Sequence, residues 1–305
     1  MKRMIWKELG TTGVSIPEVG MGTSNYRPGP EPLRQGLHAG ALFIDTAESY
    51  GAEPAVADAI EGMRERVFLA TKVSPQNFRS DALRRSVESS LMRLRVHAID
   101  LLQLHAPNPS IPIEETLGAM TAMVDAGKVR FIGVSNFSVA QLQEAQRAST
   151  RYPIVSNQVR YNIIDRTIEK DLLSYCRANR ITIIAYSPLA HRLRHIWDCD
   201  PEQSLERLSR EIGKTSAQII LNWCLCKEGV VAIPGSNSTA HIIENCGASD
   251  WRLNAEQLTL LDTSILHRQR TGFDVMLRRY APVAVKKIGL RLLNHLPRGL
   301  RRRIN

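Results

Sequence analysis

The strongest constraint on the fold of this 305-residue chain is an alternation of short apolar runs with longer segments of helical period. The apolar runs are 18–23, 41–45, 67–72, 99–104, 130–134, 154–158, 181–186 and 230–233. Segments with apolar residues at helical spacing fall at 31–39, 54–63, 80–95, 114–126, 138–148, 167–179, 203–227 (interrupted at Gly213), 239–247 and 255–266. Strands separated by helices are typical of a parallel sheet, because parallel neighbours need a crossover connection. The pattern therefore predicts an α/β fold.

Eight strand–helix units are the number that closes a (β/α)8 TIM barrel. A doubly wound dinucleotide-binding sheet would show G-x-G-x-x-G after its first strand, whereas Gly20-Met21-Gly22 lacks the third glycine. Runs 6–8 and 14–16 flank the turn-like segment 10–13, which indicates a hairpin before the first strand. We predict a TIM barrel with an N-terminal β-hairpin cap, in which Ser80 caps the third helix and the loops at 105–112 and 190–201 are short.

The excess positive charge lies at the C-terminus. The net charge is +10, and residues 268–305 hold eleven Lys and Arg but one acidic residue, so residues 1–267 sum to zero. We assign residues 1–267 to the barrel and 268–305 to a basic tail. The balanced barrel gives no reason to expect nucleic-acid binding.

The tail has three interpretations. Residues 282–297 combine apolar residues at helical spacing with basic ones, which is typical of an amphipathic helix that contacts a membrane surface or a protein partner. The tail could equally pack on the barrel and end in a solvated Arg-rich terminus, or fold over the barrel mouth and shape the substrate pocket.

Other sequence signals indicate a soluble cytoplasmic protein. No apolar secretory segment follows Met1, and no apolar run reaches the roughly 18 residues of a membrane span. The five cysteines are odd in number and form no C-x-x-C pair, so we predict reduced thiols and no metal site.

Three consecutive predicted strands end in polar residues. Asp45, Lys72 and His105 stand at or just after the ends of runs 41–45, 67–72 and 99–104, and Tyr50 follows in the first of these loops. Active sites of TIM barrels lie at the carboxyl ends of the strands. A single Lys or His there is more often structural than catalytic, so the prediction depends on all of these residues meeting at one rim.

The motifs that contain these residues resemble the aldo-keto reductase family, whose members are TIM barrels without a Rossmann fold. The resemblance covers about residues 5–266. Its motifs are 43–51, 70–72, 102–105, 127–137, 157–158, 185–189, 233–235 and 244–245. It implies an NAD(P)H-dependent enzyme that reduces an aldehyde, ketone or sugar-type carbonyl.

By this resemblance the catalytic residues are Asp45, Tyr50, Lys72 and His105. Hydride addition to a carbonyl leaves an alkoxide that needs a proton. A phenol with a pKa of about 10 is a weak acid at neutral pH, and a nearby Lys72 cation would ease its proton release. Asp45 would hold Lys72, and His105 would orient the carbonyl oxygen.

The resemblance also implies a nucleotide site. Ser135, Asn136 and Gln158 would bind the nicotinamide carboxamide, and Tyr186 would stack on the ring. Gly235 and Ser236 would bind a phosphate, and Glu244 and Asn245 would contact the adenine. The other expected cofactor-binding residues are Ser187, Leu189, Asn237 and His241. Family members that prefer NADPH usually have Arg or Lys where this chain has Asn237 and His241. NADPH is the expected cofactor, and NADH or dual use stays open.

Two other functions stay open. Lys72 could form a Schiff base in a barrel lyase or aldolase. The chain could instead be a cofactor-binding regulatory or scaffold protein that docks through its basic tail and has little turnover. The substrate and the oligomeric state cannot be read from the sequence.

Overall fold

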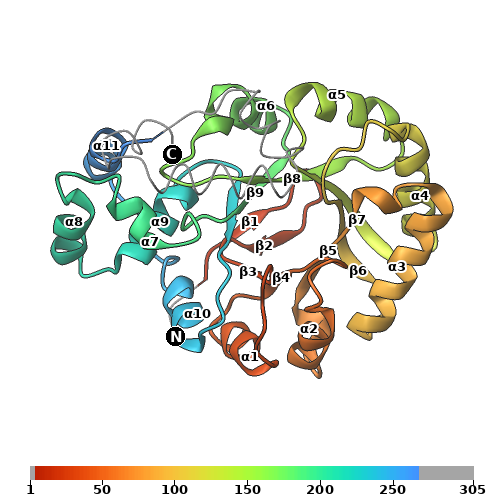
Figure 1. Cartoon of the computed structure of the whole chain (residues 1–305), viewed down its shortest axis with the longest axis horizontal. Coiled ribbons are helices and arrows are strands. Elements are labelled where there is room, and N and C mark those ends of the chain that lie inside the picture. The colour runs from red at the N-terminus through yellow and green to blue at the C-terminus, as the bar shows by residue number, and fades with distance from the viewer. Residues whose placement is uncertain (1–3, 268–305) are drawn as a thin grey trace, which may run out of the picture.

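Eight parallel strands form the centre of the protein in a computed structural model that describes residues 4–267. The strands are β3 (Met21–Gly22), β4 (Phe43–Asp45), β5 (Phe68–Val73), β6 (Ile99–Leu104), β7 (Val129–Ser135), β8 (Ile154–Arg160), β9 (Thr182–Tyr186) and β10 (Val230–Ile233). They pair in chain order, and the bridges Val19–Ala232 and Gly22–Gly235 join the two ends of the sheet. The predicted TIM barrel is confirmed, and Figure 1 shows the helices arranged around it.

The helices that surround the barrel are α1 (Glu31–His38), α2 (Glu53–Ile60), α3 (Ser80–Leu94), α4 (Ile113–Asp125), α5 (Val139–Ala148), α6 (Leu172–Ala178), α7 (Leu193–Trp197), α8 (Ser204–Ile212), α9 (Ser216–Leu225), α10 (Thr239–Cys246) and α11 (Ala255–Ser264). Short 3-10 turns occupy Arg64–Arg66, Pro75–Asn77 and Thr167–Lys170. The predicted break at Gly213 is present: this residue ends α8 with a φ of +64°, and Thr215 starts α9 with a capping box.

The predicted role of Ser80 was wrong. The N-cap position of α3 belongs to Arg79, whose backbone is extended, and Ser80 is the first helical residue. Its backbone N–H donates to Glu115 Oε1 at 3.1 Å, and the same carboxylate pairs with Arg79. A carboxylate from the neighbouring α4 therefore replaces the serine cap.

The predicted hairpin closes one end of the barrel. Strands β1 (Trp6–Glu8) and β2 (Ser15–Pro17) pair antiparallel. Leu9 and Ile16 are fully buried against the interior aromatic residues Phe43 and Phe68. This end of the barrel interior is therefore filled by apolar side chains.

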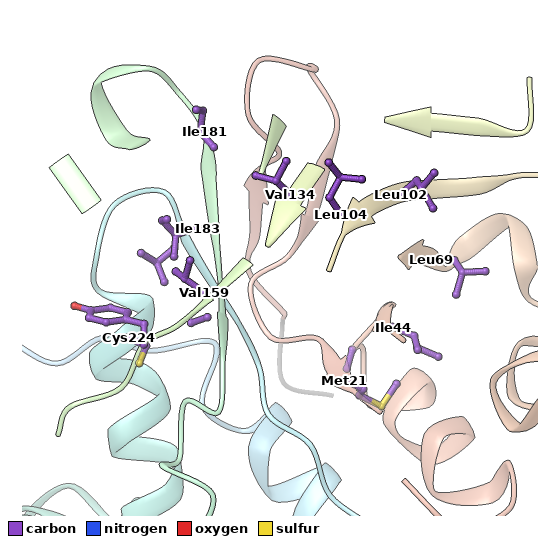
Figure 2. Packing of buried hydrophobic residues seen from close by; sticks show 14 of the residues in the cluster. Met21, Ile44, Leu69, Leu102, Leu104, Val134, Val159, Ile181, Ile183 and Cys224 are labelled. Carbon is purple, nitrogen blue, oxygen red and sulfur yellow. The ribbon is translucent and has the colours of Figure 1, made fainter. Parts of the chain in front are cut away.

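Side chains on the outer face of the barrel form the main core beneath the helices. Figure 2 shows Ile44, Leu69 and Leu102, which come from three neighbouring strands and belong to this core. Burying one such side chain stabilises the fold by roughly 1.5–3 kcal/mol. The polar residues Asp45, Lys72 and Gln103 are buried on the same three strands and Gln158 on β8, and their paired groups lie together at one end of the barrel interior.

The Gly20-Met21-Gly22 segment serves barrel closure. A Cβ on Gly20 would lie 2.6 Å from the Phe43 ring, and one on Gly22 would lie 2.8 Å from the Ile233 carbonyl oxygen. Gly20 thus packs against β4, the next strand, and Gly22 against β10, the last strand. Neither position has room for a side chain, which explains this G-x-G pair by packing.

Residues 268–305, with the predicted helix at 282–297, lie outside the described part of the chain. Within residues 4–267 no helix is long and apolar enough to cross a membrane. The five cysteines are free thiols. Burial raises the pKa of Cys176 and Cys224 to about 12, so both stay protonated at neutral pH.

Candidate active site

The four predicted catalytic residues meet at the carboxyl ends of the barrel strands. Asp45 is the last residue of β4, Lys72 lies near the end of β5, and His105 follows β6. Tyr50 stands in the loop after β4. The parallel register places these strand ends at one level, with Asp45 beside Ala70 and Lys72 beside Gln103.

Lys72 and Asp45 form a buried ion pair. Lys72 Nζ donates to Asp45 Oδ2 and, at 2.9 Å, to the Thr46 carbonyl oxygen. Each of the two charged residues is 1% exposed. Removing one partner of such a pair typically costs about 3–5 kcal/mol because the other charge is left uncompensated. The pair is therefore a fixed feature of the barrel mouth.

Tyr50 lies between the ion pair and His105. Its hydroxyl oxygen is 3.3 Å from His105 Nε2, and Lys72 Nζ is 4.9 Å from the centre of the Tyr50 ring. The Tyr50 and His105 rings meet edge to face, with centres 5.4 Å apart. The phenol thus lies between an imidazole on one side and a cation on the other.

The two rings have shifted pKa values. Burial raises the pKa of Tyr50 above its ordinary value of 10, and the Lys72 cation opposes this shift. Burial, and then the Lys72 charge, lower the pKa of His105 to about 4. At neutral pH Tyr50 is therefore a protonated phenol and His105 a neutral imidazole.

Asp45 also accepts from two buried amides. Its Oδ1 accepts from Gln103 Nε2 at 2.9 Å and from Gln158 Nε2 at 2.7 Å. Gln158 was predicted to bind the cofactor, whereas Gln103 was given no role although it lies in the motif at 102–105. The signal for it was its position on β6, two residues before His105, which gives the two side chains the same direction.

A cleft of about 740 Å³ opens beside these residues. Asp45, Tyr50 and His105 line it, and Lys72 is buried behind them. All of the residues predicted to bind the cofactor also line this cleft: Ser135, Asn136, Gln158, Tyr186, Ser187, Leu189, Gly235, Ser236, Asn237, His241, Glu244 and Asn245. The structure therefore brings the predicted catalytic and nucleotide residues to one cavity.

The cleft next to Tyr50 is lined by a hydrogen-bonded group of polar side chains. Asn136 Nδ2 donates to the His105 carbonyl oxygen at 3.2 Å and to Ser135 Oγ at 3.0 Å. The Tyr186 hydroxyl donates to Asn136 Oδ1 at 3.1 Å. Asn136 and Ser187 have φ values of +63° and +48°, and such backbone strain is often found at functional sites.

The far end of the cleft joins the first and last loops of the barrel. Asn237 Oδ1 accepts from the Arg27 backbone N–H at 3.1 Å, and His241 is exposed on the first turn of α10. Sequence reasoning missed several polar lining residues, among them Ser24, Asn25, Tyr26, His191 and Arg192. Among the described residues that line the cleft, Arg192 is the only Arg or Lys.

Comparison with known proteins decides the family. The sequence profile of the Aldo/keto reductase family matches residues 20–265. The chain belongs to this family. The predicted family, the barrel fold and the class of enzyme, an oxidoreductase that reduces carbonyl groups with a nicotinamide cofactor, are confirmed.

Relatives of this aldo-keto reductase include characterised proteins. The chain is 36% identical to methylglyoxal reductase YeaE of Escherichia coli, over 82% of this chain and 91% of that protein. It is 40% identical to the thermostable aldo-keto reductase Tm1743 in complex with the inhibitor epalrestat, with a TM-score of 0.79 over 85% of this chain and 99% of the other. An aldo-keto reductase from Klebsiella pneumoniae in complex with NADPH is 35% identical, with a TM-score of 0.80 over 88% of this chain and 98% of the other.

Proposed function

We propose that this aldo-keto reductase uses NADPH to reduce small aldehydes and ketones, with Tyr50 as the proton donor. The observation that supports this most is the Tyr50 hydroxyl, 3.3 Å from neutral His105 and close to the buried Lys72–Asp45 pair, on the wall of the cleft. A carbonyl oxygen placed between Tyr50 and His105 would meet two hydrogen-bond donors.

The chemistry can be assigned to the side chains. A bound reduced nicotinamide would supply hydride to the carbonyl carbon. Tyr50 Oη donates its proton to the carbonyl oxygen, and Lys72 stabilises the phenolate that is left. Asp45 holds Lys72 in place through Oδ2. His105 is neutral and donates from Nε2 when that nitrogen bears the proton, so it orients the carbonyl without adding a charge.

The residues of the cleft fit a nicotinamide nucleotide. Gln158 lines the cleft together with Asn136 and Ser135, and its Oε1 would accept from a carboxamide N–H. The Tyr186 ring offers a stacking surface. Gly235, Ser236, Asn237 and His241 would hold the phosphates near the start of α10, with Glu244 and Asn245 at the adenine.

NADPH is the proposed cofactor although Asn237 and His241 replace the usual cations. Arg192 supplies a fixed positive charge at the cleft, which suits a phosphate group. The Klebsiella relative is described in complex with NADPH. Since neither Asn237 nor His241 gives a full charge, we propose a preference for NADPH over NADH that is smaller than in relatives with Arg at these positions.

The substrate class follows from the relative that reduces methylglyoxal. We propose 2-oxoaldehydes and other small aldehydes as substrates. The test measures the oxidation of NADPH and of NADH by the change in absorbance. The substrates compared are methylglyoxal, simple aldehydes, keto-steroids, quinones and keto-sugars. The proposal expects turnover of small aldehydes with NADPH, and slower turnover with NADH. Tight NADPH binding without turnover of any carbonyl would contradict it.

The structure gives no support to the Schiff-base alternative. Lys72 Nζ is buried and donates to both Asp45 and Thr46, whereas a nucleophilic lysine needs a free, neutral amine. The regulatory or scaffold alternative gains no support from the relatives, which are named as reductases. A cytoplasmic location, and contact of residues 268–305 with a membrane surface or protein, are proposals that rest on sequence alone.

A further inference from the structure

Gln103 is a buried polar residue that the reaction itself does not require. It lies on β6 between Leu102 and Leu104 and has no exposed surface. The neighbouring strand leaves space for it at Gly133, where a Cβ would lie 3.2 Å from Gln103 Cγ and 2.4 Å from Ser156 Oγ. Burying an amide is unfavourable unless its hydrogen bonds are made, so we expect the Gln103 amide to have buried hydrogen-bond partners.

The carboxylate of Asp45 determines how the two buried amides are oriented. Asp45 Oδ1 lies 2.9 Å from the Gln103 amide and 2.7 Å from the Gln158 amide. An ionised carboxylate only accepts hydrogen bonds, so both glutamines must turn their NH₂ groups toward it. The amide oxygen of Gln103 then accepts from Gln158 Nε2 at 3.1 Å.

This arrangement uses both N–H groups of Gln158. One donates to Asp45 Oδ1 and the other to Gln103 Oε1. No group within residues 4–267 donates to Gln158 Oε1, and Gln158 lines the cleft. Toward the cleft, Gln158 can therefore present only an acceptor.

We propose that Gln103 is a positioning residue that holds the Gln158 amide with its oxygen toward the cleft, where it accepts from the NH₂ of a nicotinamide carboxamide. The inference rests on the proposed function. Without the Gln103 oxygen, the second N–H of Gln158 loses its buried acceptor. Rotation of the amide would then direct an N–H at the carboxamide NH₂, and two donors would face each other.

The test measures equilibrium binding to the full-length protein, with NADP⁺ and 2′,5′-ADP as ligands. Gln103→Met keeps the length and shape of the side chain and removes both hydrogen-bonding groups. We expect it to weaken NADP⁺ about 3- to 10-fold, the worth of one hydrogen bond, and to leave 2′,5′-ADP unchanged because that ligand lacks the nicotinamide. Equal weakening of both ligands, or of neither, would overturn the proposal.

Ser156→Ala is the matched control. Ser156 is equally buried and lies against Gly133, but its Oγ has no hydrogen-bond partner among the described residues. It should leave the affinity for both ligands unchanged. If Ser156→Ala weakens NADP⁺ as Gln103→Met does, the effect comes from general packing and the proposal fails.

A second measurement uses the wild-type protein, so it tests the proposal even if Gln103→Met does not fold. The 3-acetylpyridine analogue of NADP⁺ has no carboxamide NH₂. Wild-type protein should bind it about 3- to 10-fold more weakly than NADP⁺, and Gln103→Met should reduce this difference. Equal binding of analogue and NADP⁺ by the wild type would refute the proposal. If the wild type binds no NADP⁺ at all, the proposed function is wrong. If it binds NADP⁺ and the analogue equally well, only the proposal about Gln103 is wrong.

Discussion

At the scale of single residues, Asp45 connects the part of the cleft beside Tyr50 to the part that is proposed to bind the nicotinamide. Oδ2 pairs with the Lys72 cation beneath Tyr50, and Oδ1 accepts from Gln158, which lines the proposed nicotinamide site. One carboxylate thus orders both the proposed proton-donating group and a proposed cofactor ligand. Replacing it would disturb both, so single-residue tests are clearer at Tyr50, His105 and Gln103.

His105 gives a prediction for pH dependence. Its pKa is about 4 in the folded protein against 6.5 for an ordinary histidine, so the imidazole stays neutral as pH falls through 6.5. We expect kcat/KM for reduction to be flat from about pH 5.5 to about pH 9, since Tyr50 is protonated over this range. The measurement is the pH profile of kcat/KM for methylglyoxal. An acid limb centred near pH 6.5 that disappears in His105→Gln would show that the imidazole is charged there.

The same shift affects stability. Between pH 6.5 and about 4 the unfolded chain takes up a proton at His105 that the folded chain does not. This group therefore contributes stability above pH 6.5 that is lost as the pH falls toward 4. The free energy of unfolding should fall less steeply over this interval in His105→Gln than in the wild type, as urea titrations at each pH would measure.

At the scale of secondary structure, the barrel depends on glycine at its seam. Gly20→Ala would place a Cβ 2.6 Å from the Phe43 ring and 2.9 Å from the Phe43 carbonyl oxygen. We expect a loss of about 1–3 kcal/mol in the free energy of unfolding, the usual effect of overpacking, measured by urea titration. Gly118→Ala is the control: this position in α4 is exposed and has no atom within 4 Å of the added Cβ. It should be neutral or stabilising. An equally stable Gly20→Ala would show that there is room beside Phe43.

Most elements could be predicted because strand and helix periods differ. All eight strands and the hairpin fall where the apolar runs predicted them, although run 18–23 forms only the two-residue β3. Helix α7 was missed within the predicted loop at 190–201: it is five residues long, too short to show a period.

The role of Gln103 was missed because its partners come from β4 and β8, and no local pattern reveals contacts between distant strands.

At the scale of the whole molecule, charge separates the barrel from the tail. Residues 1–267 are neutral overall and 268–305 hold the +10 excess. We propose that 1–267 is an independent domain. A chain ending at His267 should fold, bind NADPH and melt within a few degrees of the full chain, as thermal unfolding would measure. Loss of cofactor binding on truncation would instead place the tail at the cleft.

Truncation also tests the tail as a contact surface. Each basic residue near an anionic membrane contributes about 1 kcal/mol to binding, so the full chain should sediment with vesicles containing phosphatidylserine and the truncated chain should not. Vesicles of neutral lipid are the control. Equal sedimentation of the two chains, or none by either, would rule out a membrane role for the tail.

The most direct test of the central claim is the rate of NADPH oxidation by Tyr50→Phe with methylglyoxal as substrate. Phenylalanine keeps the ring beside Lys72 and His105 and removes only the hydroxyl. The account predicts that kcat falls roughly 10²–10⁴-fold, the usual contribution of a positioned acid, while the dissociation constant for NADPH stays within about twofold, because no hydrogen bond of the proposed nucleotide site involves Tyr50. A Tyr50→Phe enzyme with wild-type kcat would show that another group donates the proton.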